Sequence, residues 1–552
     1  MYITRTRWKS QNGKTYETIL LRESYREEGK VKNRTLANLT HCKPEEIAAM
    51  ELGLKHKDDL TALGSLSEAV ELREGASVGA VWAAYQVAKR LGIEKALGRG
   101  VAGQLAMWQV QARVLDQGSR LSAVRLAQRH AGGDVLEMKR GFDEDDLYEN
   151  RKWLAAEQGE IERRLLAERR GRKKPELFLY DVTSSYLEGQ QNELAAYGYN
   201  RDRKRGKKPI GIGLLCDECG EPVSTEVFTG NTQDVKTLAA QVRKAAERFG
   251  CKRVTFVGDR GMIKSAGVEA LSRAGFHYIT ALTKPQIETL LKAGVLQMEL
   301  FDEELCEVEA EGVRYILRRN PRRVEELAAS RADKRASVEA VLREQNTYLR
   351  EHAKAQEAVA LRKVREKIER LGIGRWLRVE GEGRVLSLRV DEAVLSEASR
   401  LDGCYVIHTD VPKAVADRQT VHDRYKELTE VERAFRTCKT GHLEIRPVYV
   451  RTEESTRGHV LVVMLAYLIV RELQRAWASL DVTVEEGLQQ LSTLCSMEIR
   501  VKGQASCHKI PQPREISQNL LEALGVRLPE VLPHRNLRVV TKKKLPSRRK
   551  TA

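Results

Sequence analysis

"ELFLYDVTSSYLEG", residues 176–189, is an apolar run that meets a carboxylate and then three hydroxyl-bearing side chains. Leu177 to Tyr180 have the composition of a buried strand, and Asp181 follows them directly. A charge placed against a buried run costs several kcal/mol unless a partner compensates it. Asp181 is therefore either a strand-end residue in water or a place where a cation binds.

Further strand and helix patterns follow this run in a definite order. Two more strand-like runs come next, and then helix, strand, helix and strand alternate; the segments are "KPIGIGLLCD" (208–217), "GEPVSTEVFTG" (220–230), "TQDVKTLAAQVRKAAERFG" (232–250), "RVTFVGD" (253–259), "IKSAGVEALSRAG" (263–275) and "FHYITALT" (276–283). Three consecutive strands followed by this alternation predict an α/β fold with a ribonuclease-H-like mixed sheet core.

The charge balance indicates a polyanionic partner. The 552 residues carry 95 Lys and Arg against 78 Asp and Glu, a net charge of +17. Nucleic acid is the commonest partner of such a surplus, although a basic enzyme of another kind has the same composition. The N-terminal stretch shows no apolar signal segment, and the run at 459–470 is too short to span a bilayer, so we expect a cytoplasmic protein with a buried helix there.

The patterns divide the chain into six parts, in which the second core segment resumes after an inserted domain. The predicted parts are an N-terminal β-hairpin-rich module at 1–65, a helical candidate DNA-binding region at 66–170, the first core segment at 171–285, an insertion domain at 286–400, the second core segment at 401–480 and a C-terminal helical region with a basic tail at 481–552.

The nine cysteines show no framework of pairs, which favours reduced thiols. "CDECGE" at 216–221 contains the single CxxC motif, and a zinc site needs four ligands. No second pair stands at a suitable spacing, so a turn between two strands is favoured over zinc.

Two further acids stand in settings similar to that of Asp181. Asp259 ends the strand-like run "RVTFVGD" and precedes an Arg-Gly turn, and Glu432 lies in the helical pattern "DRYKELTEVERAFRTCK". Residues seven apart on a helix are nearly in line, so Tyr425, Glu432 and Lys439 are predicted to share a face, with Arg436 close to Glu432. A solvated helix with ordinary ion pairs would show the same pattern.

Three acids of this kind suit phosphodiester chemistry. Two Mg²⁺ ions about 3.5–4 Å apart can neutralise the phosphate, activate the nucleophile and stabilise the leaving oxygen. Carboxylate oxygens are the ligands that such hard cations prefer. A bound metal would also explain why Asp181 is tolerated beside its apolar run.

The chain resembles bacterial insertion-sequence transposases of the DDE class, in the group named after insertion sequence four. The similarity runs from "YREEGKVKNRTLANL" at 25–39 to "RPVYVRTEESTRGHVLVVMLAYLI" at 446–469. Asp181 in "YDVTS" and Asp259 in "GDRGM" match the two aspartates, and "TGNTQD" at 229–234 is similar to a further family segment. The family signature Tyr-x2-Arg-x3-Glu-x6-Lys matches at Tyr425, Glu432 and Lys439, whereas Leu428 occupies the Arg position.

The resemblance implies a role for each matched residue. Asp181, Asp259 and Glu432 would be the catalytic residues and would bind two Mg²⁺ ions, with Mn²⁺ as an alternative. Tyr425 and Lys439 would hold DNA phosphates, and Arg436 is our candidate for the missing arginine's role. Trp376 matches an aromatic residue that would stack on a flipped base, although a core position is favoured. The basic run "GYNRDRKRGKKP" would track the DNA backbone through Arg201, Arg203, Lys204, Arg205, Lys207 and Lys208, unless it is only a solvated hairpin tip.

The expected function is therefore a DNA transposase that cleaves transposon ends and transfers the strands into target DNA. Two alternatives remain at this point: a DNA-binding descendant whose catalysis has lapsed, and a metal-dependent nuclease without strand transfer. The implied partners are terminal inverted repeats and target DNA, and the implied assembly is a homodimer on paired ends. The implied location is the cytoplasm of a bacterium, in association with the nucleoid.

Overall fold

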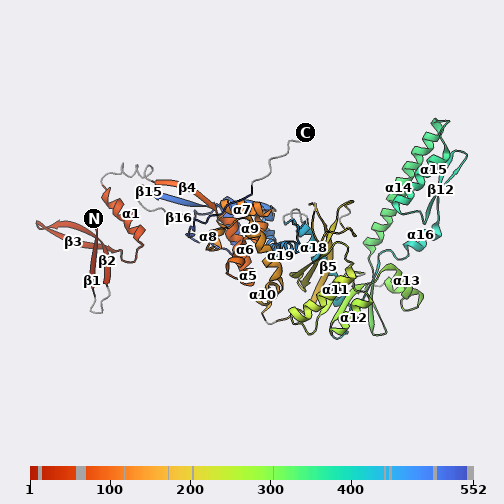
Figure 1. Cartoon of the computed structure of the whole chain (residues 1–552), viewed down its shortest axis with the longest axis horizontal. Coiled ribbons are helices and arrows are strands. Elements are labelled where there is room, and N and C mark those ends of the chain that lie inside the picture. The colour runs from red at the N-terminus through yellow and green to blue at the C-terminus, as the bar shows by residue number, and fades with distance from the viewer. Residues whose placement is uncertain are drawn as a thin grey trace.

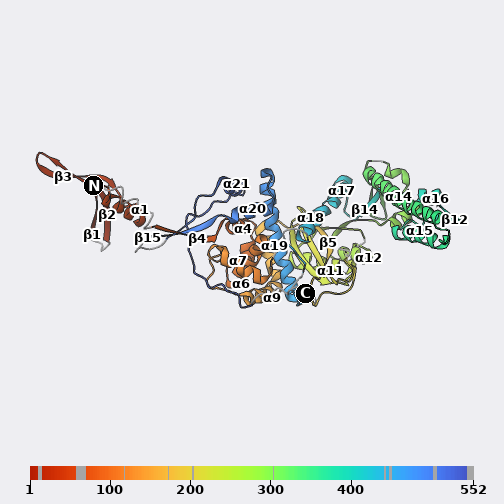
Figure 2. The ribbon, with the colours of Figure 1, turned by 90° about the horizontal axis from the view of Figure 1, so that it is seen from above.

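The computed structural model describes residues 1–9, 15–57, 70–116, 118–171, 173–189, 191–199, 201, 204–260, 262–302, 304–439, 443–446, 450–501 and 507–543, without the side chains of 234 and 235. The molecule is elongated, with an N-terminal module at one end, a helical body and a sheet-based core in the middle, and a helical arm at the far end (Figures 1 and 2).

The N-terminal module is a small antiparallel sheet with one helix. Ile19, Leu39 and Ile47 form its compact core. Its elements are β1 (Tyr2–Lys9), β2 (Thr15–Glu27), β3 (Lys30–Asn38) and α1 (Pro44–Lys55).

The central sheet has eight strands in the order β10-β11-β14-β9-β8-β5-β6-β7. β5 is parallel to β8, and β8 is parallel to β9, whereas β5, β6 and β7 are antiparallel. The strands are β5 (Leu177–Tyr186), β6 (Pro209–Asp217), β7 (Pro222–Thr229), β8 (Thr255–Gly258), β9 (His277–Ala281), β10 (Cys306–Ala310), β11 (Val313–Arg319) and β14 (Cys404–Thr409). The first five of these strands have the order and directions of a ribonuclease-H-like core, which confirms the predicted fold class.

Helices connect the core strands and lead to the site. They are α11 (Asp234–Arg243) with a π-helical turn η1 (Lys244–Arg248), α12 (Ser265–Arg273), α13 (Lys284–Lys292), a 3-10 turn η2 (Met298–Phe301), α17 (Arg418–Lys426) and α18 (Leu428–Lys439). The CxxC motif lies at the turn between β6 and β7, where Cys216 is buried and Cys219 is exposed.

The helical arm lies within the range predicted for the insertion. It consists of α14 (Pro321–Glu351), α15 (Glu357–Leu371), β12 (Leu377–Glu382), β13 (Val385–Val390) and α16 (Glu392–Ser399). Trp376 is 6% exposed and packs in the arm's own core with Val338 and Val364. The hairpin β10–β11 also falls within the predicted insertion range, but it extends the central sheet because β11 pairs with β14.

The long helix α19 (Glu453–Trp477) lies between the other helices of the helical body and the sheet core (Figure 2), and its apolar run at 459–470 is buried throughout, as predicted. The other helices are α4 (Gly79–Arg90), α5 (Ile93–Leu97), α6 (Val101–Leu115), α7 (Arg120–Arg129), α8 (Gly132–Val135), α9 (Glu144–Ala156), α10 (Gln158–Arg170), the 3-10 turn η3 (Ala478–Leu480), α20 (Val484–Ser492) and α21 (Glu515–Ala523). In the described ranges, no helix is long and apolar enough to cross a membrane.

A three-stranded sheet at the edge of the helical body adds strands to the two ranges predicted as mainly helical, 66–170 and 481–552. β15 (Cys495–Val501) lies between β4 (Val70–Ser77) and β16 (Cys507–Lys509). β4 and β15 are more than 400 residues apart in sequence. Each strand is short and mostly polar on its exposed face, so its own sequence pattern does not predict a strand. Pairing with the distant partner strand holds it in the extended conformation.

The N-terminus of α9 depends on a reciprocal cap. The Asp143 carboxylate accepts hydrogen bonds from the backbone N–H groups of Asp145 and Asp146 at 2.9 and 3.1 Å, and Asp146 accepts from the Asp143 N–H at 3.1 Å. Because this cap satisfies N–H groups that have no intrahelical partner, Asp143→Ala is expected to lower the free energy of unfolding by about 1–2 kcal/mol. Urea denaturation measures this change.

Glu149→Ala, an exposed change on the same helix, is the matched control. It is expected to stay within about 0.5 kcal/mol of the wild type. Equal losses in both variants would contradict the capping role of Asp143.

Candidate active site

The register of the central sheet brings Asp181 and Asp259 together. Tyr180 on β5 pairs with Gly258, the last residue of β8. Asp181 and Asp259 are the next residues on these two parallel strands, so both lie at the same edge of the parallel pairing. β5 itself continues to Tyr186 alongside β6, which corrects the prediction that the strand ends at Asp181. Only the pairing of β5 with β8 ends just before Asp181, whereas its pairing with β6 continues.

The Asp181 carboxyl group is half-buried and in an unfavourable electrostatic setting. Burial, with a smaller contribution from the negative charges of Asp259 and Glu432, raises its pKa to about 6. The backbone N–H of Val182, which donates to Asp181 at 2.7 Å, and the guanidinium of Arg201 act in the opposite direction. Uncompensated negative charge therefore accumulates at the edge where β8 ends.

Glu432 reaches this edge from α18. Val431, Ala434, Phe435 and Cys438 are buried on one face of this helix, which leaves Glu432 and Arg436 exposed on the other. The helical pattern at 423–439 is interrupted at Glu427, between the end of α17 at Lys426 and the start of α18 at Leu428. Tyr425 and Glu432 thus lie on successive helices, and both side chains line the same cavity.

Tyr425 and Lys439 nevertheless both contact the edge of the sheet that holds the acids. The Tyr425 hydroxyl donates to Asp259 Oδ1 at 3.4 Å, and burial raises the pKa of this phenol above its ordinary value. Lys439 Nζ donates to Thr183 Oγ1 at 3.2 Å, two residues after Asp181 on β5. The phenol and the ammonium group therefore flank the acids from opposite ends of the α17–α18 segment.

Asp181, Asp259 and Glu432 line one cavity of about 500 Å³. Tyr425 and Leu428 line it as well, so the residue at the signature's arginine position faces the same space. Cationic side chains also line this cavity: Arg260, Lys284, Arg323 and Lys426. Arg436 is exposed on α18 and is not among the described residues that line the cavity.

The donor set fits a hard divalent cation. Three carboxylates border one cavity, and burial disfavours the ionised form of Asp181 beside the other two. Oxygen ligands of this type suit Mg²⁺ or Mn²⁺. Within the part of the chain that the structure describes, no group of three His, Cys, Asp or Glu side chains is arranged closely enough to hold a metal ion without movement of the side chains.

The basic run predicted to contact DNA lies at the same end of the sheet. Pro209 pairs with Tyr186, so the residues before β6 lie beyond the carboxyl end of β5. Arg201 lies beside this end, because its backbone N–H donates to Ser184 at 2.8 Å. Lys204, Arg205, Lys207 and Lys208 are exposed, whereas Arg203 falls outside the described residues.

Two tyrosines in this segment are candidate contacts that the sequence argument missed. Tyr197 and Tyr199 are 69% and 81% exposed. Lys208 Nζ lies over the Tyr197 ring at 5.2 Å, and the Arg201 guanidinium lies over the Tyr199 ring at 6.0 Å. The signal was present in "AYGYNR", where aromatic residues alternate with small and polar ones just before the basic run.

Comparisons with known proteins point to one family. The family model described as "Transposase DDE domain" matches residues 172–469, more than half of the chain. A second, described as "IS1634 family transposase, N-terminal domain", matches residues 3–66. A search of curated proteins finds no match.

A solved structure of a piggyBac transposase synaptic complex with hairpin DNA is weakly similar to this chain. It shows 9% identity and a TM-score of 0.32, with 76% of this chain and 70% of that chain covered. The strand order of the central sheet defines the fold independently of this similarity.

Proposed function

The chain belongs to the transposase DDE domain family, and on that premise we propose that Asp181, Asp259 and Glu432 form its catalytic centre. It is an insertion-sequence DDE transposase, an enzyme that cleaves DNA at the ends of a mobile element and joins those ends to target DNA. The observation that carries the residue assignment is that all three carboxylates line one cavity at the edge where β8 ends.

Membership of the family makes the reaction dependent on a divalent metal. We propose that the three carboxylates hold two Mg²⁺ ions, which Mn²⁺ can replace. When bound, these ions supply charge neutralisation on the scissile phosphate and activation of the attacking hydroxyl group. Asp181 contributes one of these carboxylates. Because burial disfavours its ionised form, a bound cation would relieve an electrostatic penalty that the folded protein already carries.

The residues around the acids would position the DNA. The Tyr425 hydroxyl orients Asp259 through its hydrogen bond, and Lys439 lies close enough to β5 to neutralise a phosphate near the scissile bond. Arg436, exposed one turn after Glu432, would contact a phosphate farther along the strand. Leu428 leaves the signature arginine's place apolar, and Arg260 supplies a cation at the same cavity.

The segment 197–208 would bind the DNA backbone, with Arg201, Arg203, Lys204, Arg205, Lys207 and Lys208 as its charges. A double change, Lys204→Gln with Arg205→Gln, is expected to weaken binding of duplex DNA at every sequence. Each lost phosphate contact makes the slope of log K against log salt shallower by about 0.9, so two lost contacts give about 1.8. Fluorescence anisotropy between 50 and 200 mM salt, the range over which counterion release is usually compared, measures both quantities.

Lys252 and Arg253 give a matched control. They form an adjacent exposed pair just before β8, at the opposite end of the sheet from Asp259. Their double change to Gln is expected to leave the salt slope unchanged. A slope that changes equally in both double variants would show a general charge effect and would remove the DNA-binding assignment from 197–208.

Several broader assignments are also proposals. We propose a homodimer on paired ends, because two ends must be joined in concert, and a cytoplasmic, nucleoid-associated location in a bacterial cell, which the net charge of +17 supports. The six-part division of the chain given above is proposed for its domains. Assignment to the group named after insertion sequence four is supported by the spacing of Tyr425, Glu432 and Lys439, while the N-terminal match is to IS1634 family transposases.

An assay with Mg²⁺ on DNA that carries the inverted repeats flanking the reading frame tests the proposed function. Cleaved ends together with joined products are expected. Cleavage without joining would instead indicate a nuclease, and binding without cleavage would indicate that catalysis has lapsed, as the Leu428 substitution would favour. The same substrate with scrambled terminal repeats is the matched control and is expected to remain uncut.

A further inference from the structure

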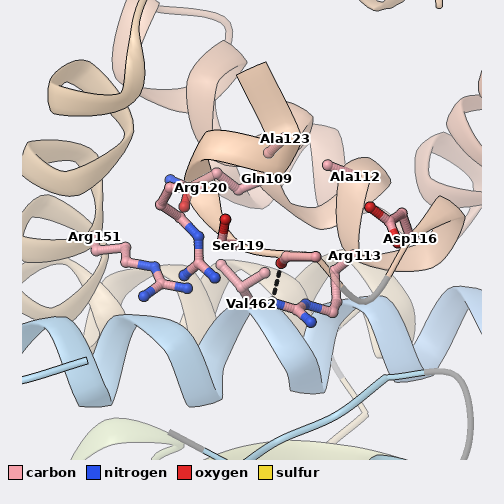
Figure 3. A pocket seen from close by; sticks show the side chains of 10 residues that line it. Gln109, Ala112, Arg113, Asp116, Ser119, Arg120, Ala123, Arg151 and Val462 are labelled. Atoms are coloured by element: carbon pink, nitrogen blue, oxygen red, sulfur yellow. Dashed lines mark hydrogen bonds between the residues drawn. The ribbon is translucent and has the colours of Figure 1, made fainter. Parts of the chain in front are cut away.

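Three buried arginines meet in the helical body, outside the acidic cavity. Arg113 on α6, Arg120 on α7 and Arg151 on α9 are only 5%, 8% and 2% exposed. They line a cavity of about 250 Å³ together with Ser119 and His459. Figure 3 shows the guanidinium groups of Arg120 and Arg151 directed into one space above α19.

Two members of this cluster, Arg120 and Arg151, carry positive charge that no described carboxylate pairs. Arg120 Nη1 and Arg151 Nε are buried and have no hydrogen-bond partner, and neither residue forms an ion pair within the described ranges. Arg113 donates to the Gly118 carbonyl at 3.1 Å. Buried guanidinium groups are normally paired, because an isolated charge loses its hydration on burial.

The neighbouring imidazole of His459 does not neutralise the positive charge of Arg120 and Arg151. Arg151 Nη2 lies 3.1 Å from His459 Nδ1, and His459 Nε2 lies 3.1 Å from the Ile445 carbonyl, which makes Nε2 the donor and leaves the imidazole neutral. Two carboxylates, Asp116 and Glu444, act on Arg113, and Glu444 also pairs with Arg446. Arg120 and Arg151 have no such carboxylate among the described residues, and Arg151 has only the neutral ring as a side-chain partner.

The surroundings suit a tetrahedral oxyanion. Gly118 and Ser119 lead into α7, where the Ser119 hydroxyl caps the Ser122 N–H, and the dipole of this helix favours negative charge at its start. Guanidinium groups bind phosphate oxygens in pairs, and three of them offer more donors than one carboxylate can accept. Tyr148, Glu444 and Arg446, which are partly exposed, form the mouth of the cavity.

We infer that this cavity is a phosphate-binding site, separate from the catalytic carboxylates. The two regions are joined by one strand: Asp181 lies within β5, and Tyr186 at its end accepts a hydrogen bond from Arg446 at the cavity mouth. Five strand residues span about 17 Å, so both regions can be occupied at once. The phosphate belongs either to the DNA backbone or to a free ion or nucleotide.

The first test is thermal unfolding of the full-length protein in phosphate against chloride at equal ionic strength and without divalent metal. The wild type is expected to gain several degrees of Tm in phosphate, because a ligand that binds only the folded state stabilises it by mass action. Arg120→Met is expected to lose this gain and to unfold no earlier than the wild type in chloride. Arg129→Met, an exposed change on the same helix, is expected to keep the gain.

Arg120→Lys is a second variant that still tests the proposal if Arg120→Met does not fold. It keeps the charge but loses the paired donors, so its half-saturating phosphate concentration is expected to rise at least about tenfold. A wild type that responds to phosphate and chloride alike would overturn the proposal. An Arg120→Met or Arg120→Lys protein that responds as the wild type does would overturn it as well.

DNA binding distinguishes the two sources of phosphate. If the site holds a backbone phosphate, Arg120→Met makes the salt slope of duplex binding shallower by about 0.9. If it holds a free phosphate or nucleotide, the slope is unchanged while the thermal response is lost. Neither measurement depends on cleavage, so failure of the catalytic assignment would leave this result readable.

Discussion

Asp259→Asn is expected to abolish both cleavage of the transposon end and strand transfer, by about 1,000-fold or more, while DNA binding remains intact. Asp259 is the first residue after β8, exposed at the acidic cavity and held by Tyr425. Asparagine preserves the size and the hydrogen bond from the Arg260 N–H but removes the charge that a divalent cation needs. Loss of a group that stabilises developing charge typically costs 100-fold to 1,000-fold, and loss of a metal ligand costs at least that.

Single-turnover cleavage and joining assays measure this loss, and anisotropy with the uncleaved end measures binding. Asp333→Asn, an exposed aspartate on α14, is the matched control and is expected to retain full activity. Cleavage by Asp259→Asn at a rate within tenfold of the wild type would remove Asp259 from the catalytic centre.

Asp181→Asn is expected to inactivate the enzyme to a similar extent and also to stabilise the metal-free protein. Burial raises the pKa of Asp181 from its ordinary value of 3.8 to about 6, so the folded state carries a penalty whenever this carboxyl group is ionised. The wild type therefore loses stability as the pH rises from about 4 through 6, and the full penalty is present above pH 6. A neutral asparagine removes it, which is worth about 1–3 kcal/mol at pH 7.5.

Denaturation of both proteins at pH 4 and pH 7.5, in the presence of a metal chelator, tests the predicted direction of the pH dependence of stability. The two stabilities are expected to converge at pH 4, where the wild-type carboxyl group is largely protonated, and to separate at pH 7.5. Added Mg²⁺ is expected to stabilise the wild type alone. A variant that is less stable than the wild type at both pH values would contradict the account of Asp181 as a carboxylate that burial disfavours.

The core of the fold was predictable because its signals are local. Each of β5, β6 and β7 is a short apolar run bounded by turn residues, and their order along the chain matches their order in the sheet. Asp181 and Asp259 could be picked out because each follows a buried run directly. Their placement side by side follows from the parallel register, which fixes where neighbouring strands end.

The parts that were missed depend on partners distant in the chain. β4 and β15 pair with each other although the whole core lies between them in the sequence, and neither has a clear strand pattern of its own. The interruption of the helix at Glu427 follows no proline or glycine, so the seven-residue spacing gave no warning of it. The arginine cluster draws on three helices, and each of its members looks like an ordinary solvated cation in its own segment.

The sheet formed by β4 and β15 also has a consequence for biosynthesis. β15 supplies the middle strand, and backbone N–H groups of Lys542 and Lys543 donate to the buried Glu144 at the start of α9. The helical body therefore cannot close until the residues up to Lys543 have left the ribosome. A chain truncated before β15 would have an open strand edge, prone to aggregation and degradation rather than to partial activity.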